Sequence, residues 1–591
     1  MTPTQTDRAH LVRITGSLAE IEPASAAFLY ELVRVGERGL LGEVVRIEGE
    51  RATAQIYEDT TGLRLGEPAE LTGESLVAEL GPGLLGAVLD GVGRPLPRVA
   101  EVSGDLLQPG VHLPSLDPDR AWKFEARLQP GTEVSGGDVL GVVAETPGIE
   151  HRVLVPPELA GRLAALESGS FKVGEPIGRL ADDTPLYLAH RWPVRRPRPY
   201  ARRLPTDLPF VTGQRIMDLL FPVAEGGSVA VPGGFGTGKT VIEQSLAKYA
   251  SADVIVYIGC GERGNEMAEV LDEFPRLDDP RTGGSLMDRS ILVVNTSNMP
   301  VAARESSVYL GITIAEYYRD MGYRVAVMAD SLSRWAEALR ELGSRLQEMP
   351  GEEGYPTYLG NRMAKYFERA GRVTAAGTPE RSGALTFIAA ISPPGGDFSE
   401  PVTQAALRVT GGLWALDPAL AHSRQFPAVD WQTSYSLYAD ACAPWFEREV
   451  AEDWEAVRNR LFALLDRERD LREIAGLIGA ESMQDEDRLL LEAAALIREL
   501  VLGQNAFDER DALSPLAKSY ALAALAEEFH EQAGAAVRSG RALEDLDLGA
   551  VRQALNAVRY ASPEGLDERV AEARKAIAHS IGKNSVGEGG A

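Results

Sequence analysis

Residues 233–240 of the chain read GGFGTGKT and satisfy the pattern G-x-x-x-x-G-K-[ST] at every position. An apolar strand candidate, residues 228–231, precedes this segment, and a helical pattern over residues 241–249 follows it. Glycines in this order let backbone N–H groups fold around a polyphosphate, and the N-terminus of the helix adds partial positive charge. The segment is typical of a phosphate-binding loop within an α/β domain, and it predicts that the chain binds a nucleoside triphosphate.

The residues of this loop have separate predicted tasks in binding ATP or ADP. The Lys239 ammonium can reach the β- and γ-phosphates, so we predict a catalytic role for it. The Thr240 hydroxyl can bind Mg²⁺, the metal that accompanies the nucleotide. The predicted nucleotide-binding residues are Gly233, Gly234, Phe235, Gly236, Thr237, Gly238, Lys239, Thr240 and Val241.

The size and charge of the chain limit the classes of protein to which it can belong. At 591 residues it is too long for one hydrophobic core, so several domains are expected. The 60 basic and 87 acidic residues leave a net charge of −27, which argues against a general nucleic-acid binder. Two cysteines cannot build a disulfide framework, and no apolar run reaches the length of a membrane span. We therefore expect a cytoplasmic protein that is associated with a membrane only through partners.

The composition and the predicted secondary structure change along the chain. Alternating short strands up to about residue 73 predict a small β-barrel, whereas residues 110–190 are rich in Pro, Gly and short strand patterns. Residues 190–199 are basic and contain three prolines, and we interpret them as an extended linker. From about residue 440 onward the pattern is helical, and the last ten residues are predicted to be disordered.

Five apolar runs between residues 210 and 435 predict buried parallel strands with helices between them. These runs are residues 229–231, 254–258, 291–294, 325–328 and 385–391, and the main helical patterns are 302–320 and 332–345. In an open parallel sheet the carboxyl ends of the strands line the ligand crevice. Polar residues that directly follow these runs are therefore candidates for chemistry.

Three of those candidates follow strand ends. Glu262 comes after residues 254–258, and a carboxylate there can orient the water that attacks a phosphate. Its neighbour Arg263 can contact the γ-phosphate. Asp330 ends the run at residues 325–330 and fits the carboxylate of a Mg²⁺ site. Glu262 and Arg263 are also compatible with solvated loop charges or a helix N-terminal acid, and for Asp330 the pattern alone is weak because many strands end in Asp.

Three further side chains are weaker candidates on local sequence alone. Arg334 follows Asp330 by one helical turn and can face the phosphates or simply the solvent. Phe426 and Phe507 are far apart in sequence, and each can be ordinary core or an apolar ring stacked on a nucleotide base. Nothing in the neighbouring residues decides between these alternatives.

Taken together, five segments resemble the catalytic A subunit, or alpha chain, of V-type and A-type rotary ATPases. They are the phosphate loop, GERGNE at 261–266, MADSLSRWAEAL at 328–339, SPPGGD at 392–397 and QNAFD at 504–508. The resemblance runs over nearly the whole chain in one order. It implies a multidomain fold with an N-terminal β-barrel, a β-rich bulge insertion, a RecA-like α/β P-loop core and a C-terminal helical domain.

The resemblance also implies boundaries, residue roles and an assembly. The expected divisions are a barrel over 1–75, the first part of the nucleotide-binding domain over 76–110, the bulge over 111–190, the RecA-like domain over 191–437 and the helical domain with its disordered tail over 438–591. Glu262 becomes the catalytic carboxylate, Arg263 and Arg334 become phosphate contacts, and Asp330 becomes the Mg²⁺-site acid. Phe426 and Phe507 become the adenine pocket.

By the same resemblance, three such chains alternate with three non-catalytic B subunits, which supply an arginine finger. The ring surrounds a central rotor stalk and is held by a peripheral stalk, and it couples ATP hydrolysis or synthesis to proton or sodium transport across a membrane. Two alternatives stay open at this point. One is a homohexameric RecA-like motor of the protein-export type. The other is a non-catalytic nucleotide-binding member of such a ring, although those chains lack the intact P-loop lysine present here as Lys239.

Overall fold

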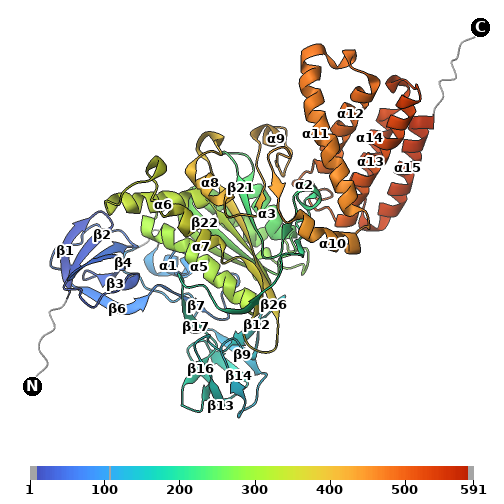
Figure 1. The fold of residues 1–591 in the computed structure, drawn as a ribbon. Helices are drawn as coiled ribbons and strands as arrows, with labels where there is room; N and C mark the ends of the chain where they lie inside the picture. Colours follow the sequence, from blue (N-terminus) through green and yellow to red (C-terminus); the bar gives the residue numbers. More distant parts are fainter. Residues whose placement is uncertain (1–8, 105–107, 583–591) are drawn as a thin grey trace, which may run out of the picture. The chain divides into compact units, whose positions relative to one another are not determined.

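The computed structural model describes residues 9–104 and 108–582, so the predicted disordered tail lies almost wholly outside the described residues. The chain forms two compact units, and neither is continuous in sequence (Figure 1). The first unit comprises Met1–Pro205, Gly226–Ser228 and Ala252–Val409. The second comprises Thr206–Glu225, Val229–Ser251 and Thr410–Ala591.

The first unit begins with an antiparallel β-barrel. Its strands are ordered β1-β2-β5-β4-β3-β6. An isolated antiparallel bridge between His10, in the first strand, and Pro68, just before the last strand, links the two ends of this sheet. The alternating apolar residues face inward and form a closed core around Leu11, Val33 and Val44. The strands are β1 (His10–Thr15), β2 (Leu18–Glu22), β3 (Glu31–Val35), β4 (Leu40–Glu48), β5 (Arg51–Ile56) and β6 (Ala69–Ser75).

Two four-stranded antiparallel sheets make up the next part of this unit, with the orders β10-β13-β15-β16 and β12-β11-β9-β14. They share an apolar core that includes Trp122, Phe124 and Leu163, and their strands confirm the short strand patterns seen in this stretch. The strands are β9 (Ala121–Ala126), β10 (Glu133–Val134), β11 (Val139–Thr146), β12 (Ile149–Leu154), β13 (Gly161–Leu166), β14 (Gly169–Lys172), β15 (Pro176–Leu180) and β16 (Pro185–Tyr187).

The segment that we interpreted as a linker is partly a strand. Residues His190–Pro193 form β17, which pairs antiparallel with β7 (Val77–Leu80). The Trp192 side chain is buried, and the nearby Arg198 is buried as well. The linker interpretation was therefore wrong here, because Arg195 and Arg198 of this segment form ion pairs with buried carboxylates inside the unit.

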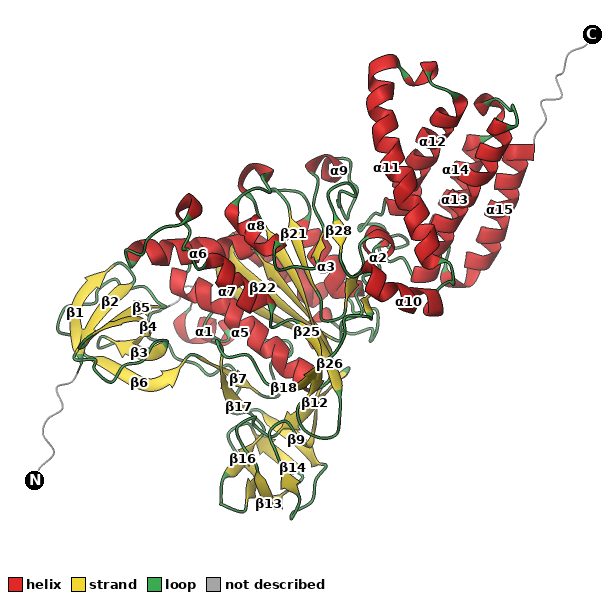
Figure 2. Ribbon diagram, viewed as in Figure 1, coloured by secondary structure: helices red, strands yellow, loops and turns green. Residues whose placement is uncertain are grey.

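The α/β part of the first unit contains parallel strands in the order β26-β24-β22-β23-β8. The antiparallel β25 pairs with β26, and β18 pairs with β25. The helix α5 packs along this sheet (Figure 2). The strands are β8 (Val88–Leu89), β18 (Tyr200–Arg203), β22 (Val254–Glu262), β23 (Ser290–Thr296), β24 (Arg324–Asp330), β25 (Gly371–Ala375) and β26 (Ser382–Ile391). The helices are α1 (Leu96–Ser103), α4 (Gly264–Glu273), α5 (Val301–Asp320), α6 (Leu332–Arg345), α7 (Leu359–Phe367) and α8 (Pro401–Leu407).

The second unit joins the P-loop to the C-terminal helices. Its strand β21 pairs in parallel with β27, and β27 pairs antiparallel with β28. The short elements are β19 (Pro209–Phe210), α2 (Arg215–Leu220), β20 (Val223–Ala224), β21 (Ser228–Pro232), α3 (Lys239–Tyr249), β27 (Gly412–Leu413), α9 (Pro418–His422) and β28 (Tyr435–Ser436). The C-terminal helices are α10 (Ala439–Glu449), α11 (Trp454–Ile478), α12 (Asp485–Leu496), α13 (Leu516–Arg538), α14 (Leu548–Arg559) and α15 (Leu566–Gly582).

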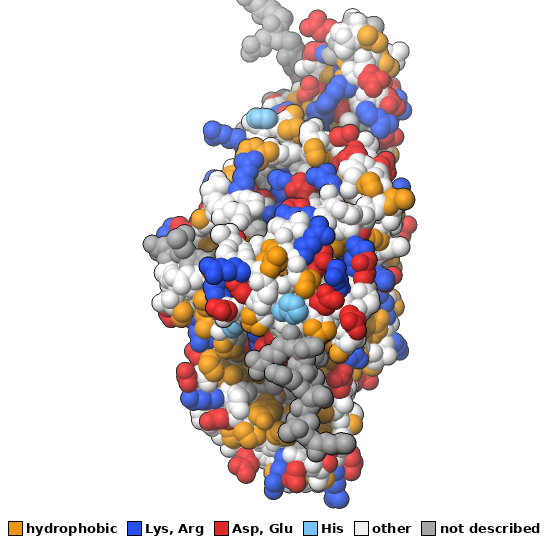
Figure 3. Space-filling view, turned by 90° about the vertical axis from the view of Figure 1, so that its left-hand side faces the viewer, with side chains coloured by type: hydrophobic (Ala, Val, Ile, Leu, Met, Phe, Trp, Pro, Cys, Tyr) orange, Lys and Arg blue, Asp and Glu red, His pale blue; other side chains and the backbone are white. Residues whose placement is uncertain are grey.

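Acidic and basic side chains are interspersed over the face of the molecule shown in Figure 3. Among the described residues, none of the helices combines the length and the apolar character needed to cross a bilayer. Both cysteines are buried, and burial raises the pKa of the Cys260 thiol to about 12. Cys260 is thus an inert core residue, as expected for a thiol that is kept from solvent.

Candidate nucleotide-binding site

The P-loop joins the buried strand β21 to the helix α3 within the second unit. Helix α3 begins at Lys239, whose ammonium nitrogen donates hydrogen bonds to the carbonyl oxygens of Gly233 at 2.8 Å and Gly234 at 3.0 Å. The buried Thr237 hydroxyl donates to the Gly234 carbonyl at 2.8 Å. The loop is therefore closed around its own lysine, which has carbonyl partners that a phosphate oxygen can replace.

Gly238 is required by the close approach of an aromatic ring. Its φ of +84° is left-handed, and a Cβ at this position would lie 2.6 Å from Cε1 of Phe426. Only glycine combines this backbone conformation with this contact. Phe426 is consequently seated against the turn that starts α3, although it is far from the P-loop in sequence.

Phe426 also contacts the second predicted aromatic residue. The rings of Phe426 and Phe507 lie edge to face, with centroids 5.5 Å apart and an interplanar angle of 84°. Phe507 is 72% exposed, so most of its ring faces solvent. An exposed ring that is held by a neighbouring ring beside a P-loop is suited to stack on a nucleotide base.

A buried polar network holds the segment that carries Phe507. The backbone N–H of Phe426 donates to the carbonyl of Gln504, and the N–H of Asn505 donates to a carboxylate oxygen of Asp511 at 2.8 Å. Asp511 in turn forms an ion pair with Arg215 at 2.7 Å, and both side chains are fully buried. Neither Gln504 nor Asp511 was predicted from sequence to be a site residue. The only available signal was that Gln504 belongs to the QNAFD segment.

Two predicted carboxylates lie at the ends of adjacent parallel strands of the first unit. Glu262 is the last residue of β22 and Asp330 is the last residue of β24, and these strands pair directly, with Gly259 opposite Asp330. Both carboxylates are buried, and Oε1 of Glu262 has no hydrogen-bond partner among the described residues. Burial and, secondly, the negative charge of Asp330 raise the pKa of Glu262 to about 8. A buried pair of acids is a site that a metal ion or a cationic group can complete.

The two predicted arginines differ in their surroundings. Arg334 lies in the first turn of α6 and pairs with Glu337 at 2.8 Å. It is close to the end of β22, because a Cβ at Gly261, where φ is +71°, would lie 2.8 Å from Cβ of Arg334. The side chain of Arg263, which precedes α4, is 56% exposed and lies 4.0 Å from Glu266.

The structure thus brings together the P-loop, Phe426 and Phe507 in the second unit. In the first unit it brings Glu262, Asp330 and Arg334 to one end of the sheet, where Arg263 follows Glu262. Sequence alone left Phe426, Phe507 and Arg334 undecided between site and core or surface. The tertiary contacts put all three beside other predicted site residues.

Comparison with known proteins identifies the class to which this fold and P-loop belong. The family model described as ATP synthase alpha/beta family, nucleotide-binding domain, matches residues 213–436. The beta-barrel domain of the same family matches residues 11–73, and its barrel-sandwich domain matches residues 113–195. The C-terminal domain of V and A type ATP synthase matches residues 443–546.

Relatives that match over most of their length identify the family more specifically than the domain matches do. The chain is 58% identical to the V-type ATP synthase alpha chain of Anaeromyxobacter dehalogenans, over 91% of this chain and 93% of that one. It is 49% identical to the V-type ATP synthase alpha chain 1 of Clostridium tetani, over 98% of this chain and 98% of the relative. The chain belongs to the family of V-type and A-type ATP synthase alpha chains. The predicted fold class and the family resemblance are confirmed.

A solved structure is similar in fold. The assembled ATPase EscN of the enteropathogenic E. coli type III secretion system aligns with a TM-score of 0.61 at 21% identity, covering 86% of this chain and 98% of that one. At this identity the likeness concerns the fold alone. It therefore does not favour the protein-export alternative over the rotary family.

Proposed function

We propose that this chain is the catalytic subunit of a rotary V/A-type ATP synthase and that its P-loop, with Phe426 and Phe507, binds ATP and ADP. The observation that carries this proposal is the P-loop itself, closed around Lys239 and bordered by the half-buried Phe426 and the exposed Phe507. The membership of the family of ATP synthase alpha chains supports it independently. ATP hydrolysis or synthesis is the reaction of that family.

We assign the following roles to the charged residues. Lys239 neutralises the β- and γ-phosphates, and Glu262 accepts a proton from, or orients, the water that attacks the γ-phosphate. Arg263 and Arg334 contact the transferred phosphate and spread its developing charge. Because burial raises the pKa of Glu262 to about 8, this carboxyl needs a nearby positive charge to be ionised at neutral pH.

One residue of each unit carries an oxygen ligand whose chemistry suits a magnesium ion. The Thr240 hydroxyl and the Asp330 carboxylate are hard oxygen ligands of the kind Mg²⁺ prefers, and Asp330 and Glu262 form a buried acidic pair. When bound, Mg²⁺ neutralises phosphate charge and so lowers the cost of transferring the γ-phosphoryl group. Thr240 is accordingly proposed as one ligand, and Asp330 as another that acts directly or through water.

The assembly that we propose is an alternating ring of three such chains and three B subunits around a central rotor. The neighbouring B subunit supplies an arginine finger, a peripheral stalk holds the ring, and the membrane is reached through the ion-translocating sector. In this assembly the chain lies on the cytoplasmic face of a membrane. The intact Lys239 and Glu262 argue against the alternative of a non-catalytic ring subunit.

The proposal is tested by isolating the complex through a tag on this chain, in low salt with Mg-nucleotide. An alternating ring with a second chain of similar size and ATP turnover is expected. In that complex Glu262→Gln should retain nucleotide binding and lose about two to three orders of magnitude in turnover, because such a change removes a contact made in the transition state. A ring of this chain alone with full turnover, or normal turnover of Glu262→Gln, would contradict the proposal.

A further inference from the structure

A cavity of about 650 Å³ in the first unit is rich in basic side chains. Its described lining includes seven cationic residues but only two glutamates, on a chain whose net charge is −27. The lining shares no residue with the P-loop segment 233–241. From this cavity we propose that the chain has a second anion site, which binds a small phosphate-bearing molecule through Lys365 and Arg203.

Most of the cations around the cavity are already neutralised and form its rigid wall. Arg195 pairs with Glu43 and Glu305 at 2.6 Å each. Its guanidinium also stacks on Tyr30 and Tyr309, 4.5 and 4.8 Å from the ring centroids. Arg369 donates to Glu316 at 3.0 Å and is only 5% exposed. These pairs hold the arginines in place, and they leave little charge for a ligand.

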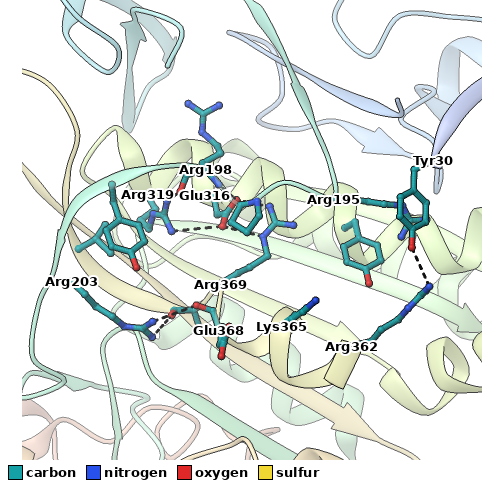
Figure 4. A pocket seen from close by; sticks show the side chains of 15 residues that line it. Tyr30, Arg195, Arg198, Arg203, Glu316, Arg319, Arg362, Lys365, Glu368 and Arg369 are labelled. Carbon is teal, nitrogen blue, oxygen red and sulfur yellow. Dashed lines mark hydrogen bonds and ion pairs between the residues drawn. The ribbon is translucent and has the colours of Figure 1, made fainter. Parts of the chain in front are cut away.

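Two cations of the lining are not neutralised in this way. Lys365, in the last turn of α7, is exposed and forms no ion pair among the described residues. Arg203 donates to the carbonyl oxygens of Ala370 at 2.6 Å and Glu368 at 3.5 Å and likewise has no carboxylate partner in the described chain. In Figure 4 the Lys365 side chain extends between those of Glu368 and Arg362. Both positive charges are therefore available to an anion in the cavity.

The size and chemistry of the cavity favour a phosphorylated small molecule. Its volume falls in the range of small-ligand pockets, about 300–1,000 Å³. A guanidinium fork and an ammonium are suited to neighbouring phosphate groups, which carry more than one charge between them. The Tyr30 hydroxyl, held by Arg362 at 3.4 Å, is a further polar group at the rim. A diphosphate group carries enough negative charge to pair with both of these cations.

The test uses inorganic pyrophosphate and the full chain carrying Lys239→Ala, which silences the P-loop. Isothermal titration calorimetry should still detect one bound pyrophosphate, and higher KCl should weaken it. Adding Lys365→Gln should weaken the affinity about tenfold, and adding Arg203→Gln should weaken it further. Lys365→Arg should keep most of the affinity, and Lys172→Ala, at an exposed lysine of β14 outside the cavity, should change nothing.

Three outcomes would overturn the inference. The first is the absence of pyrophosphate binding to the Lys239→Ala chain, and the second is binding that Lys365→Gln leaves unchanged. The third is binding of a short polyglutamate peptide in place of pyrophosphate, which would make the cavity a docking site for an acidic protein segment. Because the Lys365 side chain is exposed and makes no ion pair in the described structure, Lys365→Gln should not disturb folding, and an unchanged thermal unfolding midpoint checks this.

Discussion

The ring of Phe507 stands edge to face against the ring of Phe426, 5.5 Å away between centroids, and Phe426 in turn touches the P-loop at Gly238. Two residues that are remote in sequence thus form one apolar surface next to the predicted phosphate site. The exposed Phe507 ring has little packing to lose, so its contribution can be measured without unfolding the chain.

We expect Phe507→Ala to weaken ADP binding about 5- to 150-fold, because stacking on a base contributes about 1–3 kcal/mol. Pyrophosphate binding at the P-loop should not change, since pyrophosphate carries no base. Titration of both ligands in a Lys365→Gln background measures this difference, and Phe507→Tyr is the matched control that keeps the ring. Equal losses for ADP and pyrophosphate would show that Phe507 supports the loop and does not contact the base.

Lys239→Ala should abolish ATP turnover in the assembled complex, because the Lys239 ammonium is the one cation that the loop holds between the carbonyls of Gly233 and Gly234 in the described structure. The matched control is Lys248→Ala, at the other end of the same helix α3. Steady-state ATP hydrolysis measures both. Turnover of Lys239→Ala at the level of the control would refute the P-loop assignment.

The raised pKa of Glu262 predicts a pH dependence of stability. The usual pKa of a glutamate is near 4.5, and in the folded chain it is about 8, so the folded state favours the protonated carboxyl. Its contribution to stability is therefore fully present below about pH 4.5 and is lost as the pH rises through about 8.

This effect is measured by comparing Glu262→Gln with the unmodified chain in thermal unfolding at pH 6 and pH 9, without nucleotide. The variant should gain stability relative to the unmodified chain at pH 9 by more than about 1.4 kcal/mol, the equivalent of one pKa unit. At pH 6 the gain should be smaller. A difference that does not depend on pH would contradict the raised pKa.

Asp511 is predicted to support both folding and nucleotide binding. It pairs with the fully buried Arg215 and accepts from the N–H of Asn505, in the segment that carries Phe507. Asp511→Ala leaves a buried guanidinium without its partner, so we expect a loss of about 3–5 kcal/mol in unfolding free energy. Asp508→Ala removes a solvent-screened ion pair with Arg510, whose side chain is 69% exposed, and should cost far less stability. Urea unfolding compares the two variants, and equal losses would contradict the argument.

The same network is predicted to lose stability at low pH. Burial acts to raise the pKa of Asp511, but the guanidinium groups of Arg559 and Arg215 outweigh it and hold the pKa below the usual 3.8. A lowered pKa stabilises the fold above the unfolded-state value, and this stability is lost as the pH falls through the folded-state value. Unfolding followed below pH 4 should therefore show an acid-dependent loss that Asp511→Asn lacks.

Much of the fold followed from local patterns. The runs at residues 254–258 and 325–328 lie within β22 and β24, and the predicted helix at 332–345 coincides with α6. The strand predicted at 254–258 was too short, because β22 continues through Glu262 and its polar end pairs with β23. Backbone pairing with a neighbouring strand extends a strand beyond its apolar stretch, and this cannot be seen in the strand's own residues.

By itself the sequence determined the P-loop, the order of strands and helices and the family, because these depend on residues that are neighbours in the chain. Only the tertiary structure decided that Phe426 and Phe507 form one surface, that Glu262 and Asp330 share a buried strand end, and that Lys365 and Arg203 face a common cavity. Burial and electrostatic coupling arise between residues that are distant in sequence. A side chain's pKa, its exposure and its available charge are therefore properties of its surroundings in the fold.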